Sequence, residues 1–103
     1  MTRRPLALSI ARRVKKDILA ATEWWEANRR AAPGAITDEV DKALDLLQTA
    51  PEAGVSVPGT RLFGVRRVPL ERIDYHLYYR INARRSRITV LALWHARRRP
   101  PTL

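Results

Sequence analysis

Two strand-like segments joined by an arginine-rich turn dominate the C-terminal half of the chain. In residues 75–81, YHLYYRI, side-chain character alternates with a period of two, which is typical of a β-strand with two different faces. Residues 88–94, ITVLALW, are apolar on both faces, as expected of a central strand. The turn between them spans residues 82–87, so the two strands are predicted to form a hairpin. The hairpin would hold the following segment, WHARRR at positions 94–99, at the edge of a rigid sheet.

The alternation also predicts which side chains share a face of this sheet. One set should pack under the helices and the other should face the open side, namely Tyr75, Leu77, Tyr79 and Ile81 inward and His76, Tyr78 and Arg80 outward.

The first half of the chain predicts one short strand and two helices. Apolar residues alternate over residues 6–10, which indicates a strand. The next apolar residues follow at spacings of four, three and four, which is one stripe of a helix that ends near residues 28–30: Val14, Ile18, Ala21 and Trp25. After a turn at Pro33-Gly34, a second helix is predicted from about residue 36 to residue 48.

Residues 51–60 are predicted to form a loop, and residues 61–70 a further strand. The resulting order is β-α-α-β-β-β. We therefore expect an α+β fold in which a helical hairpin packs on one face of a mainly antiparallel four-stranded sheet. A chain of 103 residues has room for one core, so residues 1–103 are expected to form a single domain.

Composition excludes several classes of site. The chain has no cysteine, and its two histidines lie at positions 76 and 95, which is no recognised metal-ligand spacing. The four glycines form no phosphate-binding or dinucleotide-binding motif, so neither a metal nor a cofactor is expected. The apolar stretch behind the basic start covers only Leu6–Ile10, too short for a signal peptide or a membrane span. A cytoplasmic protein is the expectation.

Positive charge is concentrated in the C-terminal part. Residues 1–60 hold nine basic and eight acidic side chains, whereas residues 61–103 hold eleven arginines and only two acids, Glu71 and Asp74. Seventeen of the twenty basic residues are arginines, whose planar fork binds phosphate or carboxylate through two hydrogen bonds. The C-terminal part is therefore predicted to contact a polyanion or an acidic partner.

The candidate functional surface is a basic open face with aromatic residues among the cations. Such a surface could bind an acidic protein segment or a nucleic acid backbone. It could also cleave RNA, with arginines stabilising the phosphate while a histidine or tyrosine moves the proton of the 2′-hydroxyl. The residue types alone leave both open for the set Arg66, Arg67, His76, Tyr78, Arg80, His95, Arg97 and Arg98.

The three tryptophans are assigned different roles. Trp25 and Trp94 are expected to pack in the core. Trp24 points elsewhere on the same helix, because adjacent helical residues lie about 100° apart, and it is a candidate anchor for a partner.

Over nearly its whole length the chain resembles the RelE/ParE superfamily of toxins from type II toxin–antitoxin systems. The resemblance lies in the element order, in RLFGVRR at positions 61–67, in YHLYYRI at 75–81 and in VLALWHARR at 90–98. A last strand followed by His, a small residue and two arginines is typical of the ParE branch. The resemblance implies a toxin that inhibits DNA gyrase by protein–protein binding. For this activity we expect the target contact at Trp94, His95, Arg97 and Arg98, with Arg66 and Arg67 beside them.

The RelE branch of the same superfamily implies a different activity, the cleavage of mRNA in the ribosomal A site. Its nucleases carry an arginine at the second position of the third strand, where this chain has His76, and several carry a catalytic tyrosine near the C-terminus, where this chain has none after Trp94. As an endoribonuclease the chain would contact the ribosome or nucleic acid through its basic face and would use Arg66, Arg67, His76, Arg80 and Arg98. A toxin-like fold that has lost its toxicity is a third alternative.

All members of the superfamily imply a cognate antitoxin, here a ParD-like one. Such antitoxins are partly disordered and wrap across the helices and the sheet edge of the toxin. The expected anchors for the antitoxin on this chain are Trp24, Ile36 and Leu47.

Overall fold

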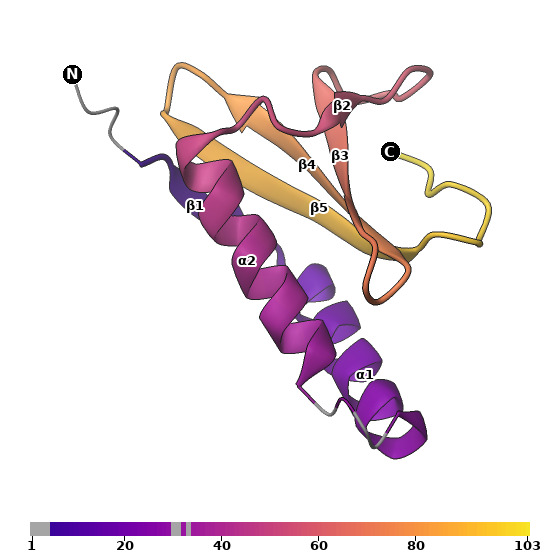
Figure 1. Ribbon diagram of the computed structural model, residues 1–103. Coiled ribbons are helices and arrows are strands. Elements are labelled where there is room, and N and C mark those ends of the chain that lie inside the picture. The colour runs from indigo at the N-terminus through magenta and orange to yellow at the C-terminus, as the bar shows by residue number, and fades with distance from the viewer. Residues whose placement is uncertain (1–4, 30–31, 33) are drawn as a thin grey trace.

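Two helices cover one face of a five-stranded sheet in the computed structural model, which describes residues 5–29, 32 and 34–103 (Figure 1). The strands lie in the order β1-β5-β4-β3-β2, with β1 parallel to β5 and the other neighbouring strands antiparallel. The elements are β1 (Ala7–Ile10), α1 (Arg12–Asn28), α2 (Ala35–Thr49), β2 (Val55–Ser56), β3 (Val65–Leu70), β4 (Tyr75–Asn82) and β5 (Arg87–His95).

The α+β class, the helical hairpin on one face and the order of the main elements are confirmed. The sheet has one strand more than expected, because Val55–Ser56 pairs with β3 inside the segment predicted as a loop. β3 itself begins at Val65, so the residues from 61 to 64 belong to the connection that precedes it.

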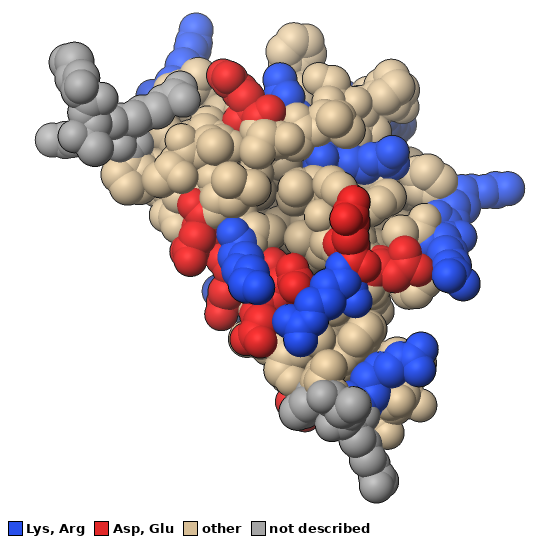
Figure 2. Space-filling model, viewed as in Figure 1, with Lys and Arg blue, Asp and Glu red and all other residues tan. Residues whose placement is uncertain are grey.

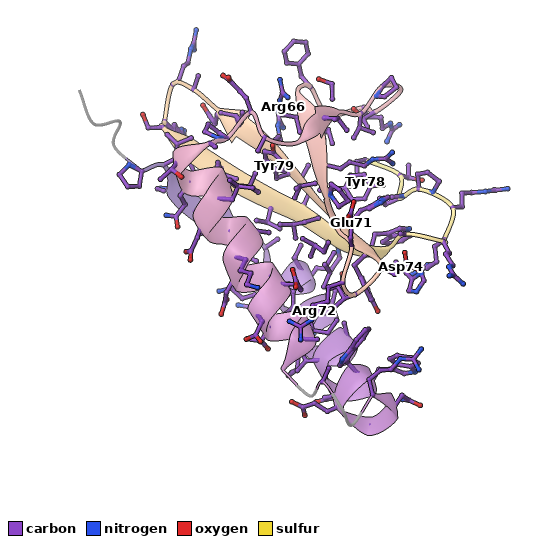
Figure 3. The ribbon with its side chains drawn as sticks, in the orientation of Figure 1. Arg66, Glu71, Arg72, Asp74, Tyr78 and Tyr79 are labelled. Carbon is purple, nitrogen blue, oxygen red and sulfur yellow. The ribbon has the colours of Figure 1, made fainter. Side chains whose placement is uncertain are left out.

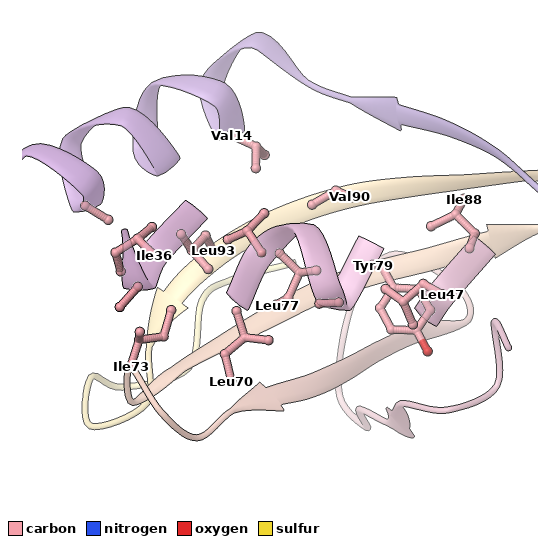
Figure 4. Packing of buried hydrophobic residues seen from close by; sticks show 14 residues of the cluster. Val14, Ile36, Leu47, Leu70, Ile73, Leu77, Tyr79, Ile88, Val90 and Leu93 are labelled. Atoms are coloured by element: carbon pink, nitrogen blue, oxygen red, sulfur yellow. The ribbon is translucent and has the colours of Figure 1, made fainter. Parts of the chain in front are cut away.

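The buried side chains form two clusters, one on each face of the sheet. The larger cluster lies between the helices and the sheet and includes Val14, Ile36, Leu47, Leu77 and Tyr79 (Figure 4). The smaller cluster lies on the open face and consists of Val65, Tyr78 and Ala92. Successive residues of β4 thus enter different clusters, which confirms the alternation predicted for this strand.

One residue of β5 has no partner on β4. Tyr78 pairs with Ala92, whereas Tyr79 pairs with Val90, so Leu91 is left between them as a β-bulge. Side chains alternate between faces along a strand, and an extra residue therefore reverses the alternation for everything that follows it.

The bulge decides where the last residues of β5 point. Trp94 pairs with His76 on the open face, and His95 pairs with Tyr75 on the helix side. Trp94 therefore packs against the smaller cluster and stays partly exposed. It was expected in the core, and it contacts the smaller cluster instead of the larger one under the helices.

Tyr79 fastens the chain between α2 and β2 to the sheet. Its fully buried hydroxyl donates to the Pro51 carbonyl at 2.6 Å and accepts from the Gly54 amide at 2.9 Å. Burial raises the pKa of Tyr79, so the hydroxyl keeps the proton that it donates. A Cβ at Gly54 would lie 2.6 Å from this hydroxyl oxygen and 2.7 Å from the Arg67 carbonyl oxygen, closer than real Cβ atoms approach. Glycine at this position therefore lets β2 form against β3.

We predict that Tyr79→Phe destabilises the fold by about 1–3 kcal/mol, because the buried Gly54 amide loses its acceptor. Urea unfolding followed by circular dichroism measures this change. Tyr75→Phe, at a partly exposed tyrosine on the same strand face, serves as the control and should shift the free energy of unfolding much less. Equal stability of wild-type and Tyr79→Phe proteins would contradict the role given to this hydroxyl.

Candidate functional site

Arg66 and Arg67 lie on opposite faces of the sheet, although the sequence placed them together on the open face. Arg66 pairs with Tyr79, on the helix side, and Arg67 pairs with Tyr78, on the open side. The Nη1 atom of Arg66 donates to the Gly54 carbonyl at 2.7 Å, near Tyr79 (Figure 3). The predicted place of Arg66 on the open face is therefore wrong, because neighbours on a strand point to opposite faces. Arg66 instead holds the turn before β2.

Four candidate residues come together where the chain leaves β5, and we call this group the C-terminal rim: Trp94, His95, Arg97 and Arg98. The guanidinium carbon of Arg98 lies 4.0 Å from the centre of the Trp94 ring, a close cation–π contact. The Trp94 indole also donates to the Arg99 carbonyl at 2.8 Å.

The turn that carries the two arginines of the rim is held by His95. The Arg97 amide donates to Nδ1 of His95 at 3.2 Å, and the Arg98 amide donates to the His95 carbonyl at 3.1 Å. In its neutral form His95 therefore carries its proton on Nε2, which remains free to donate to a partner. The rim is a short, hydrogen-bonded turn on the end of a strand.

Asp74 contacts the C-terminal rim, and the sequence did not single it out as a site residue. It ends the β3–β4 turn with a left-handed φ of 60°, which Asp tolerates better than most residues. Its carbonyl accepts the Ala96 amide at 2.9 Å, and its carboxylate lies 3.1 Å from Nε of Arg97. Figure 3 shows it beside the chain that leaves β5. The sequence offered one indication of this contact, because Asp74 is one of only two acids among the arginines after residue 60.

A cavity of about 890 Å³ opens between α1 and the ends of β4 and β5. Its aromatic lining comes from Trp24 and Trp25 on α1 and from Tyr75, Trp94 and His95 on the sheet. The Tyr75 and His95 rings meet edge to face with their centres 5.2 Å apart.

Charged groups also line this cavity, and cations outnumber acids there. The four cationic side chains are Arg29, Arg72, Arg97 and Arg98, against Asp17 and Asp74. Burial raises the pKa of Tyr75, against the opposing effect of Arg98, so its hydroxyl is a neutral donor at pH 7. The cavity therefore suits an apolar side chain accompanied by carboxylates.

The residues expected of a nuclease do not converge on one point. His76 and Arg67 lie on the open face, whereas Arg66 lies on the other side. Arg80 is four residues along β4 from His76, which is roughly 13 Å. Arg98 stacks on the ring of Trp94, and Trp94 in turn is the residue of β5 that pairs with His76.

His76 sits in a partly buried and electropositive setting. Its ring centre lies 6.3 Å from that of Tyr78, which is itself almost fully buried. Burial lowers the pKa of His76 below the ordinary 6.5, and the nearby Arg67 cation lowers it further, while Asp74 acts in the opposite direction. His76 is therefore largely neutral at pH 7.

Two of the three expected antitoxin anchors lie inside the core. Ile36 and Leu47 are 0% exposed and belong to the larger cluster, so this part of the prediction is wrong. A partner could reach them only by displacing the core. Trp24 is 52% exposed and stacks edge-on against Trp25, whose indole donates to the Ala32 carbonyl at 2.7 Å.

The surface charge is divided between the elements. Figure 2 shows acidic side chains over α2, whose exposed acids include Asp38, Asp41 and Asp45, and cationic side chains around the chain that leaves β5. Arg72 bridges the two regions and lies 3.6 Å from Glu39.

Among the described residues, no group of three or more histidines, cysteines or acids is arranged to hold a metal ion. Within the same residues, no helix is both long and apolar enough to span a membrane.

The fold is a small α+β domain of the RelE/ParE type, and comparison with known proteins assigns the family. Residues 8–100 match the family model described as the ParE toxin of the type II toxin–antitoxin system parDE. The chain therefore belongs to the ParE toxin family.

Solved structures share its fold. The chromosomal ParDE toxin–antitoxin system from P. aeruginosa contains a chain that is 21% identical, with 87% of this chain and 95% of that one covered and a TM-score of 0.69. A mutant of the E. coli toxin RelE in the free state is 17% identical, with 90% and 85% covered and a TM-score of 0.60. The archaeal RelE–RelB complex from Pyrococcus horikoshii contains a chain that is 21% identical, with 96% of this chain and 100% of that one covered and a TM-score of 0.59. No curated protein sequence matches the chain.

We predict that His76 titrates below pH 6.5 in an NMR titration and that Arg67→Gln raises its pKa. As the pH falls, His76 of the unfolded chain binds a proton before His76 of the folded chain does, because the pKa is lower in the folded chain. The contribution of His76 to stability is therefore complete above pH 6.5 and is lost as the pH falls through the folded pKa. Arg80→Gln is the control, because it removes a cation farther along β4 and should leave the titration unchanged. A pKa at or above 6.5 in the wild-type protein would contradict the setting described for His76.

Proposed function

We propose that this ParE-family toxin inhibits DNA gyrase by protein–protein binding and that a cognate, ParD-like antitoxin neutralises it. The observation that carries the proposal is the C-terminal rim, a rigid cationic and aromatic turn at the end of the central hairpin. The match of residues 8–100 to the ParE toxin model supports it. Gyrase lies in the cytoplasm, so we place the toxin there as well.

In this proposal the rim contacts the target without catalysis. The indole of Trp94 supplies apolar area, and Arg98, stacked on that ring, directs its donors towards a carboxylate. Nε2 of His95 adds a further donor. Because the turn is already fixed by its own hydrogen bonds, little conformational entropy is lost when the target binds.

The antitoxin is proposed to bind where it masks the rim. Trp24, the exposed candidate anchor, lines the same cavity as all four rim residues. A segment that places apolar and acidic side chains in this cavity would cover Trp94, His95, Arg97 and Arg98 at the same time. The similar structures include a ParDE toxin–antitoxin system from P. aeruginosa and an archaeal RelE–RelB complex, which supports the existence of such a partner.

We expect Arg97→Ala/Arg98→Ala to weaken inhibition of gyrase supercoiling by at least about tenfold, because the rim loses both guanidinium groups at the contact. The matched control is Arg84→Ala/Arg85→Ala, which removes the same charge from the β4–β5 turn at the opposite end of the hairpin. The control should inhibit nearly as well as the wild-type chain. Equal losses in both double variants would show that only net charge matters, and normal supercoiling at saturating wild-type toxin would refute gyrase as the target.

For the antitoxin, we expect Trp24→Ala to lower affinity at least about tenfold, since an exposed tryptophan beside a cavity is a typical interface anchor. Isothermal titration calorimetry with the antitoxin encoded beside the toxin measures this. Glu26→Ala, at an exposed position on the same helix, is the control. Unchanged affinity of the Trp24→Ala variant would remove this residue from the interface.

Ribosome-dependent mRNA cleavage is the second candidate function. One observation favours it, a largely neutral His76 next to the Arg67 cation, which is the pairing that a general base and a phosphate-binding group require. The spread of Arg66 and Arg80 away from His76 weighs against it. Primer extension on translated mRNA distinguishes the two functions, because only the nuclease produces cuts that follow the codon phase.

A further inference from the structure

Three of the large apolar side chains that the described residues expose gather around the connection between β2 and β3. Val55 on β2 is 59% exposed, and Leu62 and Phe63 in the connection are 37% and 90% exposed. Phe63 has the highest exposure of the set. Single exposed apolar residues are ordinary, but an exposed aromatic ring that follows an exposed leucine in one loop, with an exposed valine on the adjoining strand, has the composition of an interface centre.

The connection that presents Phe63, residues 57–64, is held in one shape, and we call it the Phe63 loop. Its base is closed by the Val57 amide, which donates to the Val65 carbonyl at 2.9 Å. The amides of Arg61 and Leu62 both donate to the Leu103 backbone oxygen at 3.0 Å.

Two more features fix this loop. Gly59 and Gly64 adopt left-handed φ values of 75° and 73°, which other residues adopt only under strain. Val57 and Leu103 pack against the smaller cluster on the open face. The loop therefore presents Phe63 from a fixed frame, and fixing it in advance lowers the entropic cost of binding.

The charge around the loop favours an acidic partner. From Ala53 to Leu70 the chain contains three arginines and no acidic residue. Arg66 already donates to the Gly54 carbonyl on the helix side, so Arg61 and Arg67 are the cations offered to a partner. A protein surface fits better than nucleic acid, because Val55 and Leu62 add aliphatic area, whereas base stacking uses aromatic faces.

The Phe63 loop is also distinct from the proposed antitoxin site. The cavity beside α1 is lined by residues of α1, of the β3–β4 turn, and of the ends of β4 and β5 with the turn that follows, and no residue of the loop is among them. A partner that fills the cavity therefore leaves Phe63 available for a second contact.

We propose that Phe63 is an apolar anchor that inserts into a pocket on an acidic protein surface of the toxin's target. The inference rests on the proposed function, which makes DNA gyrase that target. Phe63 and the C-terminal rim then form two separate contacts with one enzyme, the first mainly apolar and the second mainly cationic.

Phe63→Ser tests the inference, since a largely exposed side chain can be replaced with little effect on stability. Two properties are measured with purified DNA gyrase holoenzyme, the inhibition of supercoiling and direct binding in the absence of DNA. Phe63→Ser should weaken both at least about tenfold, while Phe63→Trp, which keeps an aromatic ring, should stay near wild type. Leu19→Ser is the matched control, because Leu19 is 59% exposed on α1.

The outcomes separate this inference from the proposed function. If the wild-type chain neither binds nor inhibits gyrase, the proposed function fails and the anchor fails with it. If the wild-type chain inhibits and Phe63→Ser inhibits equally, only the anchor fails. Weaker binding of Phe63→Ser to labelled oligonucleotides, or to the cognate antitoxin, would assign the loop to nucleic acid or to the antitoxin and overturn the inference.

Discussion

The pairing of β4 with β5, including the bulge at Leu91, is the constraint on which the rest of this structure depends. The pairing makes β5 a central strand between β1 and β4. The bulge decides which of the last two residues of the strand faces which side: Trp94 faces the open side and His95 the helix side. The turn with Arg97 and Arg98 follows directly. A strand without the bulge would direct Trp94 towards the helices.

The sequence was sufficient to predict the elements whose side chains follow a regular period. The period of two in β4 and the apolar stripes of the helices identified the class, the order and most of the boundaries, because burial on one face imposes these patterns. It could not place single residues that depend on pairing between strands. Arg66 needed the register of β3, and Trp94 needed the bulge. Ile36 and Leu47 were misassigned because an apolar stripe that faces a core looks the same as one that faces a partner.

The structure brings together some of the residues that the sequence proposed as a site. The four residues of the C-terminal rim do lie together, and their proximity in the sequence was the reason that they could be found. Asp74 was missed because its contacts with Ala96 and Arg97 join segments that are distant in the sequence. The cavity beside α1 combines residues from both halves of the chain, and only the folded structure reveals it. A partner that binds in this cavity would contact the exposed Trp24 and cover the C-terminal rim at the same time.

The central claim is that the C-terminal rim, the hydrogen-bonded turn at the end of β5, binds the target. Hydrogen–deuterium exchange on the toxin, alone and bound to DNA gyrase, tests it most directly, because exchange reports protection of each backbone segment. We expect the strongest added protection at residues 94–99. A complex in which this segment exchanges as fast as in the free toxin, with protection confined to other surfaces, would contradict the claim.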